Sequence, residues 1–366
     1  MFTQRHYPSK IAPAELDQYL ARGWFRMGQL IFTTRFIFFF AKLYSVIWLR
    51  LPLEEYVPKK RLRKLSRRNH ARFRVAYGPM RIDREKEMLY IRYRIDRERL
   101  SADSLYSSLL DFNGKSIYNT WETRVYDGDK LIAFSFFDLG KDSAESITGV
   151  YDPDYQQFSL GIFTMLLEVE FLQARGMRYY YPGYIVPGYH PFAYKTRLGE
   201  EQLEYYMPDE HIWEPYLHFD ETETPAIRMT EKLSELSVAL RRAGIPALER
   251  IYPPHDLHMH MADEEGITAM AFPLFIQVYP SSLALSQAFC IHFDFRTGEY
   301  VLQQYIVYSD IAKEYNLKRS NPKDYRRICT NILIEDQHLL RSPSVAYLVD
   351  HIRSKITRDG TVSKKD

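Results

Sequence analysis

The stretch from Gly149 to Arg197 holds residue types that could do chemistry on an activated carbonyl group. Ser159, Leu160 and Gly161 begin a helical pattern, and free backbone N–H groups and the positive end of the helix dipole collect at such a point. A helix start of this kind can hold a phosphate or a developing oxyanion. Hydroxyl groups follow on the next predicted strand, at Tyr179, Tyr180, Tyr181 and Tyr184. The alternative is an ordinary helix terminus beside an aromatic core, and these residues alone leave both open.

Three predicted elements position these groups. A strand over Glu145 to Tyr151 ends at Asp152, because a residue that precedes a proline avoids the helical region. Ser159 is the predicted N-cap of a helix over 160–174, whose apolar residues recur at helical spacing. A strand rich in tyrosine follows over 177–186. A strand, a helix and a strand at this spacing predict a right-handed βαβ crossover with a parallel strand pair.

The same stretch resembles the C-terminal half of the arginyl-tRNA–protein transferase family, which includes bacterial leucyl-transferring relatives. The family pattern is a YDP turn, an SLG helix start, a YxxLGY-like strand and a downstream YK pair. The residues that match are Tyr151, Asp152, Pro153, Ser159, Leu160, Gly161, Tyr181, Gly183, Tyr184, Tyr194 and Lys195. Pro182 stands where the family usually has leucine, and the segment from Val186 to Tyr194 lacks the usual Cys and Lys-Met. The resemblance implies an acetyltransferase-like (GNAT) fold, and the departures leave open which amino acid is transferred.

The N-terminal part is similar to the same family over Tyr19 to Gly28, where a helix runs into an RGWR-like turn. Family members often carry cysteines beside this helix that are associated with metal or cluster binding. This chain has 2 cysteines, Cys290 and Cys329, and neither lies in that region. Two cysteines make no disulfide framework and no zinc or iron–sulfur motif. We therefore expect no metal and no cofactor, with charged tRNA as the co-substrate.

The densest positive charge runs from Lys59 to Arg74, a predicted helix that contains no Asp or Glu. A solvated surface helix normally mixes both signs, whereas a stripe of one sign is typical of contact with a phosphate backbone. The segment also matches an Arg-Arg-Asn stretch of the family. The residues expected to bind tRNA are Arg61, Arg63, Lys64, Arg67, Arg68 and Asn69. A basic helix that faces an acidic patch of the same protein, or a nuclear localisation signal, is the alternative.

Composition limits the class of protein. The 366 residues are 46% apolar and 26% charged, as in an ordinary folded protein, and the net charge of +2 implies that any nucleic-acid signal is local. The most membrane-like run, Leu30 to Leu49, is broken by Arg35 and Lys42 and falls short of the roughly 18 uncharged apolar residues that a span needs. No secretory signal leads the chain. We expect a cytoplasmic protein without a membrane partner, and the oligomeric state stays open.

Three domains are predicted: residues 1–75 with the basic segment, 76–207 with the GNAT-like core, and 208–366 as an additional extension. From Arg84 onward the predicted order is helix, helix, strand, hairpin, strand, helix, strand. This is the acetyltransferase order, so the expected fold class is mixed α/β (α+β). In the extension we predict helices over 229–243, 323–331 and 344–356 and strands over 268–279, 285–295 and 300–308.

A histidine-rich segment in the extension reads His255-Asp256-x-His258-x-His260. Imidazole and carboxylate groups suit zinc or iron. No partner motif accompanies them, and two prolines directly before them indicate a loop, so a histidine-rich surface turn is the favoured interpretation.

The proposed chemistry requires no Ser/His/Asp or Cys/His arrangement, and none stands out. An aminoacyl ester on tRNA is already activated, and a protein α-amine, with a pKa of about 7.7 to 8.0, is partly neutral near physiological pH. The enzyme must mainly position the two groups and stabilise an oxyanion. The resemblance therefore implies an aminoacyltransferase that acts on proteins beginning with Asp or Glu, with arginine as the first expectation and leucine as the second.

Roles for the site residues follow from this chemistry. We expect the N–H groups of Ser159, Leu160 and Gly161 to face the ester carbonyl. The other expected site residues are Tyr181 and Tyr184 along the groove, Tyr151 and Asp152 at its mouth, and Lys195 or Arg197 at the acidic residue of the acceptor. A non-catalytic tRNA-binding adaptor and an N-acyltransferase that uses a coenzyme A thioester are the alternatives. The second is disfavoured because the helix start over 157–162 has a single Gly.

Overall fold

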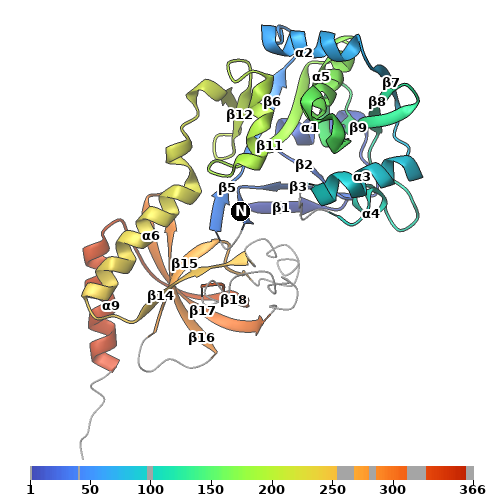
Figure 1. The fold of residues 1–366 in the computed structure, drawn as a ribbon. Helices are drawn as coiled ribbons and strands as arrows, with labels where there is room; N and C mark the ends of the chain where they lie inside the picture. Colours follow the sequence, from blue (N-terminus) through green and yellow to red (C-terminus); the bar gives the residue numbers. More distant parts are fainter. Residues whose placement is uncertain are drawn as a thin grey trace, which may run out of the picture. The chain divides into compact units, whose positions relative to one another are not determined.

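The computed structural model describes residues 2–39, 42–96, 102–253, 268–279, 286–310 and 327–359. They form two compact units, whose elements are labelled in Figure 1. The central unit consists of Arg5–Thr33 and Val46–Phe219, and the C-terminal unit consists of Met1–Gln4, Thr34–Ser45 and Asp220–Asp366. No helix in these described ranges is long and apolar enough to cross a membrane.

The units divide the chain at positions other than the predicted boundaries after residues 75 and 207. Strand β6 (Ile47–Pro52) precedes the first of these boundaries, yet it pairs with β11 (Tyr179–Ile185) and β12 (Glu204–Met207). Strand β13 (Ile212–Pro215) follows the second boundary and pairs with β12. Strand pairing between segments that are distant in sequence therefore joins the first two predicted domains into one sheet.

The central unit is built on an eight-stranded sheet in the order β13-β12-β6-β11-β10-β9-β8-β7. The remaining strands are β7 (Arg74–Pro79), β8 (Thr120–Asp127), β9 (Lys130–Leu139) and β10 (Ser143–Tyr151). All neighbours are antiparallel except β10 and β11, which are parallel as predicted. Strand β7 lies at the edge, where Pro79 needs no ladder partner for its missing N–H.

Helices cover both faces of this sheet. They are α1 (Pro13–Ala21), α2 (Lys60–His70), α3 (Arg84–Asp96), α4 (Leu105–Leu109) and α5 (Leu160–Gln173), with short 3-10 helices η1 (Pro153–Phe158), η2 (His190–Leu198) and η3 (Tyr216–His218). Helix α5 is buried almost all round, because the sheet covers one side and α2 packs on it from outside. Helices α3 and α4 contribute to a separate apolar core. The order β7, α3, α4, β8, β9, β10, α5, β11 confirms the predicted GNAT-like fold class.

The segment before this core also contains short strands. They are β1 (Thr3–His6), β2 (Phe25–Met27), β3 (Leu30–Thr34), β4 (Phe36–Phe39) and β5 (Lys42–Ser45). The two long strands predicted over 30–40 and 43–51 are therefore each divided, at Arg35 and Val46. The physical reason is that the chain leaves the central unit at Thr34 and returns to it at Val46.

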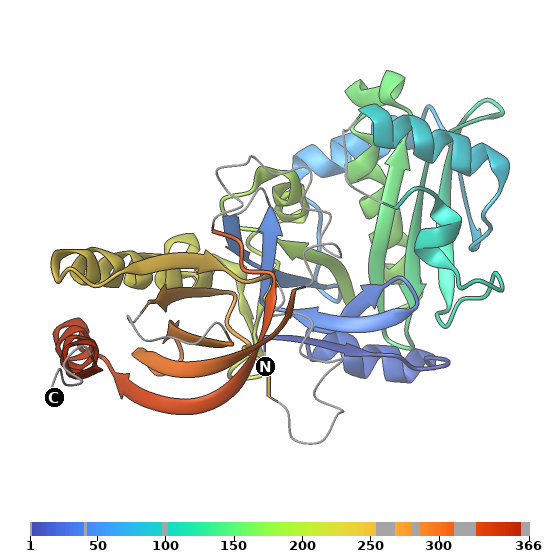
Figure 2. The same ribbon diagram turned by 90° about the horizontal axis from the view of Figure 1, so that it is seen from below.

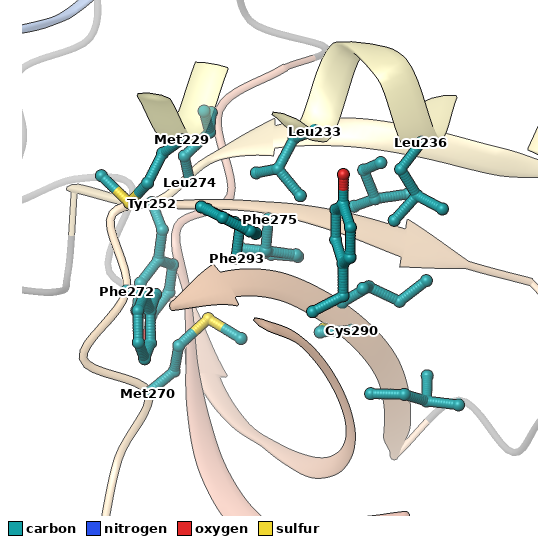
Figure 3. Close-up of a cluster of buried hydrophobic side chains, with 14 of the residues drawn as sticks. Met229, Leu233, Leu236, Tyr252, Met270, Phe272, Leu274, Phe275, Cys290 and Phe293 are labelled. Atoms are coloured by element: carbon teal, nitrogen blue, oxygen red, sulfur yellow. The ribbon is translucent and has the colours of Figure 1, made fainter. Parts of the chain in front are cut away.

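The described part of the C-terminal unit contains an antiparallel sheet in the order β14-β15-β16-β17-β18, together with helices α6 and α9. Its elements are α6 (Pro225–Arg242), β14 (Ala247–Ile251), β15 (Leu274–Val278), β16 (Gln287–Asp294), β17 (Glu299–Asp310), β18 (Asn331–Ser342) and α9 (Val345–Asp359), with η4 (Glu221–Glu223) before α6. The long strands β17 and β18 curve visibly in Figure 2. Figure 3 shows Met229, Leu233 and Leu236 of α6 pointing toward Phe275 and Cys290 of the sheet, so the apolar stripe of the helix covers one sheet face.

Most elements predicted for the extension are confirmed, with shifted ends. Strand β18 was missed, because a run of four exposed polar residues, Glu335 to His338, lies in its middle and no clear alternation marks it. The helix predicted over 323–331 is wrong for its described residues 327–331, which form no helix and lead into β18. The histidine-rich segment with His255, His258 and His260 lies outside the described residues.

Candidate functional site

The parallel strands β10 and β11 separate in the middle of the sheet. Their pairing ends at Glu145 and Tyr181, although β10 continues to Tyr151 and β11 to Ile185. We call the two unpaired ends, residues 146–151 and 182–185, the fork. Residues 146–149 are partly exposed although β10 has a neighbouring strand on each side, so the fork gives access to the interior of the sheet.

Backbone irregularities in both strands produce the fork. The register of β10 with β9 shifts between Ser146 and Thr148, and that of β11 with β6 shifts between Tyr180 and Gly183. Pro182 lies inside the second irregularity, where a residue without an N–H group disturbs a ladder least. The departure of Pro182 from the family pattern is therefore accommodated by a bulge, and bulges bend strands away from their neighbours.

Helix α5 begins directly beyond the fork. Ser159 occupies the N-cap position as predicted, but its backbone is left-handed (φ 51°) and its side chain makes no capping hydrogen bond. Its own N–H donates to the carbonyl of Gln156 at 3.1 Å. Within the described chain, no backbone acceptor is found for the N–H groups of Leu160 and Gly161. Leu160 is fully buried and Gly161 is partly exposed, so the Gly161 N–H is the predicted donor that a ligand can reach.

Asp152 anchors the turn that leads to α5. Its side chain is almost fully buried, accepts from the N–H of Asp154 and forms ion pairs with Lys130 at 2.7 Å and Arg92 at 3.0 Å. Burial by itself would raise the pKa of this carboxyl, but the hydrogen bonds from Lys130 and the Asp154 N–H, with the nearby charges, lower it. Asp152 is thus engaged on all sides, and it positions the start of α5.

Tyr151 and Gly161 fit against each other at the open end of the fork. The ring of Tyr151 packs edge-on against Tyr93 with centroids 5.1 Å apart. A Cβ atom at Gly161 would lie 3.3 Å from the Tyr151 ring, which explains a glycine in the first turn of α5. Two of the residues expected at the site therefore lie together, with the Tyr151 ring beside Gly161.

The two predicted groove tyrosines have different surroundings. Tyr181 is buried against Phe25 and Trp213, and burial raises the pKa of its hydroxyl. Tyr184 is half-buried and stacks on Phe192 with ring centroids 5.1 Å apart, and burial raises its pKa to about 12. Both hydroxyls therefore stay protonated near neutral pH, and Tyr184 is the one with exposed surface.

Lys195 comes from η2 to the fork. Its side chain is buried, and its Nζ donates to the carbonyl oxygen of Tyr184 at 2.7 Å. A side chain at position 183 would crowd this contact, because a Cβ at Gly183 would lie 3.0 Å from Nζ. Arg197, the other predicted acceptor-binding cation, is exposed. Lys195 therefore ties η2 to β11, and Arg197 is the cation that remains at the surface.

Gly183→Ala tests this contact. Gly183 has a φ of +89°, and we expect strain of about 1–2 kcal/mol from a side chain there. Displacing the Lys195 ammonium from its carbonyl acceptor should cost about 1–3 kcal/mol more. Gly128→Ala is the matched control, because Gly128 has a φ of +61° with open space around it. Urea unfolding should show the larger loss for Gly183→Ala, and equal losses would contradict the role of Lys195.

A buried ionic cluster lies at the last pair of β10 and β11, around Glu145. The guanidinium of Arg26 pairs with Asp138 at 3.1 Å, and the Arg26 N–H donates to Glu145 at 3.0 Å. Burial, and then the neighbouring Asp138, raise the pKa of Glu145 well above its usual value, against the lowering effect of Arg26 and Lys195. Sequence reasoning missed this cluster, because charged residues in a strand are equally compatible with a solvent face.

Helix α2 presents the predicted basic surface. Arg61, Arg63, Lys64, Arg67 and Arg68 are exposed along it. Asn69 differs from the prediction: it is fully buried, and its Nδ2 donates to the carbonyl of Phe158 at 2.9 Å. It therefore fixes α2 to the residue just before the N-cap of α5 and does not reach the surface.

Parts of this chain are similar to known proteins. Residues 85–204 match the family described as "Arginine-tRNA-protein transferase, C terminus". The chain is 26% identical over 212 residues to an aspartate/glutamate leucyltransferase of Leptospira interrogans, covering 57% of this chain and 80% of that protein. It is 27% identical over 199 residues to one of Vibrio cholerae, covering 53% and 82%.

Among solved structures, a tandem GNAT protein from the clavulanic acid biosynthesis pathway is 12% identical, with a TM-score of 0.30 over 54% of this chain and 60% of that one. The fold assignment rests on the strand order described above and not on this likeness. The matched segment contains the fork, α5 and β8 to β11. The resemblance noted in the sequence is thereby confirmed: residues 85–204 match the arginine-tRNA-protein transferase C-terminal family, and the similar proteins are named aminoacyltransferases.

Proposed function

We propose that this protein transfers an amino acid from a charged tRNA to the N-terminal α-amine of proteins that begin with Asp or Glu. The observation that carries the proposal is the fork, which opens beside the start of α5 within the family-matched segment. Because the relatives are named aspartate/glutamate leucyltransferases, we place leucine first as the donor and arginine second. Charged tRNA as donor also implies a cytoplasmic site of action.

The basic face of α2 indicates which end of the fork receives the tRNA. Arg68 donates to the carbonyl of Gln157 at 3.4 Å, and Asn69 holds Phe158, so α2 packs at the start of α5. Phosphates bound along α2 would therefore lead to the start of α5, where Gly161 is partly exposed. We infer that the N–H group of Gly161 holds the phosphate of the 3′-terminal nucleotide of the tRNA, instead of the ester carbonyl as first expected. The ester then lies deeper in the fork.

The reaction needs no cofactor in this scheme. The neutral α-amine of the acceptor attacks the ester carbonyl, and the 3′-oxygen of the tRNA leaves with a proton. Strand N–H groups that lack a partner across the fork can donate to the oxyanion, and their fixed position is what makes such donors effective. Holding both substrates in line converts a bimolecular step into an effectively unimolecular one. Arg197, exposed on η2, is the proposed partner of the acidic acceptor residue.

Transfer of labelled amino acid tests the proposal. Leucine and arginine, each from its own charged tRNA, are offered with peptides that begin with Asp, Glu or Ala. We expect leucine on the Asp and Glu peptides and none on the Ala peptide. The same Asp peptide with an acetylated N-terminus controls for transfer to the α-amine. No labelling by either amino acid, with tRNA binding retained, would contradict the proposal and favour the non-catalytic adaptor.

A further inference from the structure

Glu168 is a fully buried carboxylate in the middle of the apolar helix α5. Its Oε2 accepts a hydrogen bond from the hydroxyl of Tyr180 at 2.7 Å. Its Oε1 makes no hydrogen bond of standard geometry in the part of the chain that the structure describes, although weaker contacts from the hydroxyls of Ser135 and Ser146 lower the pKa of the carboxyl group. Burial of a charged group without full pairing is costly, so this oxygen is an unusual feature of a core that is otherwise well packed.

The other buried carboxylates of the described residues each have a cation nearby. The pairs are Glu122 with Lys86 and Arg124, Asp138 with Arg26, Asp152 with Lys130 and Arg92, and Asp294 with Arg296. Glu145 faces the charges of Arg26 and Lys195. Glu168 has no ion pair among the described residues, and the groups that lower its pKa are the hydroxyls of Ser135, Tyr180 and Ser146. A cation on a bound ligand would give Glu168 the kind of partner that the other buried carboxylates have.

Glu168 lies at the closed end of the fork. Tyr180, its hydrogen-bond partner, pairs with Ala144, one position before the last pair of the two strands. Ser146, whose hydroxyl lowers the pKa of Glu168, is the first residue of the fork and is partly exposed. The buried carboxyl group therefore lies behind the accessible floor of the fork, next to the irregularity in β10.

The geometry points to Glu168 as the binding site for the α-ammonium group of the amino acid carried by the tRNA, reached beside Ser146 at the closed end of the fork. This inference rests on the proposed function. An ammonium group brings three donors and a positive charge, which match the weakly paired Oε1 and the missing counter-ion. Glu168 lies seven positions after Gly161 along α5, a rise of about 10 Å. That span accommodates a terminal sugar and its aminoacyl group between the phosphate and the carboxylate.

The assignment also explains how the donor amine and the acceptor amine are held in different protonation states. An α-amine with a pKa near 7.7 to 8.0 is present in both forms at neutral pH. The acceptor amine must be neutral to attack. A carboxylate partner keeps the donor amine protonated, because an opposite charge favours the charged form. The donor amine is thereby prevented from competing as a nucleophile.

Binding of charged tRNA with a free or a blocked α-amine tests the inference. The full chain is titrated with leucyl-tRNA and with N-acetyl-leucyl-tRNA. We expect the wild type to bind leucyl-tRNA about tenfold more tightly or better, as for loss of one partner of a buried charge pair. Glu168→Gln should bind both at the weaker level. Tyr180→Phe is the control for disturbance of the core, because it removes the hydroxyl that donates to Glu168 and keeps the carboxylate. This variant should still bind leucyl-tRNA more tightly than N-acetyl-leucyl-tRNA.

Two outcomes would overturn the assignment. The first is equal binding of leucyl-tRNA and N-acetyl-leucyl-tRNA by the wild type. The second is a preference for leucyl-tRNA that survives in Glu168→Gln. Either result leaves the proposed function standing if labelled leucine still reaches the Asp peptide. If arginine is the donor, the same comparison applies with arginyl-tRNA. Tighter binding of N-acetyl-arginyl-tRNA than of N-acetyl-leucyl-tRNA, lost in Glu168→Gln, would assign the carboxylate to the guanidinium and contradict the inference.

Discussion

Replacement of Arg61, Lys64 and Arg67 by alanine is expected to flatten the salt dependence of tRNA binding by about 2 to 3 in the slope of log K against log salt. Each phosphate contact releases bound counterions, which contributes about 0.7 to 0.9 to this slope. The three side chains are exposed on α2 and form no ion pair with the described residues. Arg63 and Arg68 are left in place, because they also contact the carbonyls of Pro58 and Gln157.

Binding is measured by titration of labelled tRNA at several salt concentrations. Arg241 and Arg242 provide a matched control, because they are exposed at the end of helix α6 in the C-terminal unit. Their replacement by alanine should leave the slope unchanged. If the α2 variant keeps the wild-type slope, this face of α2 does not bind the phosphate backbone.

Glu168→Gln is expected to gain stability over the wild type as the pH rises. Burial raises the pKa of Glu168 from 4.5 to about 7. Between these values the folded state binds a proton that the unfolded state has released, so wild-type stability falls as the pH rises from about 4.5 to 7. A difference of this size corresponds to about 3 kcal/mol. Glutamine carries no charge to bury and can still accept the hydrogen bond from Tyr180.

Urea unfolding at pH 4, 6 and 8 measures this effect. The free energy of unfolding of Glu168→Gln relative to the wild type should increase by about 3 kcal/mol between pH 4 and pH 8. Glu231→Gln, an exposed position on α6, is the control and should show no such trend. If the difference in free energy of unfolding between Glu168→Gln and the wild type does not change with pH, the charge of the carboxylate is already compensated inside the fold. That result would also remove the reason for a cationic ligand.

Together, the two experiments on Glu168 separate stability from binding. If the carboxylate exists to receive the donor ammonium, the glutamine variant should be more stable at pH 8 and less selective for a free α-amine. A residue with only a packing role would not produce both changes.

Local sequence signals determined the core of the site. Helical spacing over 160–174, a glycine at 176 and the proline after Asp152 are short-range properties, and they placed β10, α5 and β11 correctly. The charge pattern of 59–74 likewise predicted an exposed basic helix, because helical periodicity and the absence of acids are visible in one dimension. The missed exception was Asn69, whose burial depends on where Phe158 lies.

Tertiary structure decided the features on which the mechanism depends. The fork arises from two register shifts whose partner strands, β9 and β6, come from distant parts of the chain. Glu168 directly follows the apolar run Met165 to Leu167, a signal that was present in the sequence. Its meaning depends on whether a cation lies nearby, and only the packing of α5 on β9, β10 and β11 shows that the described chain supplies none. Periodicity specifies which face of an element is apolar, whereas the surroundings of a charge depend on strands brought together by long-range pairing.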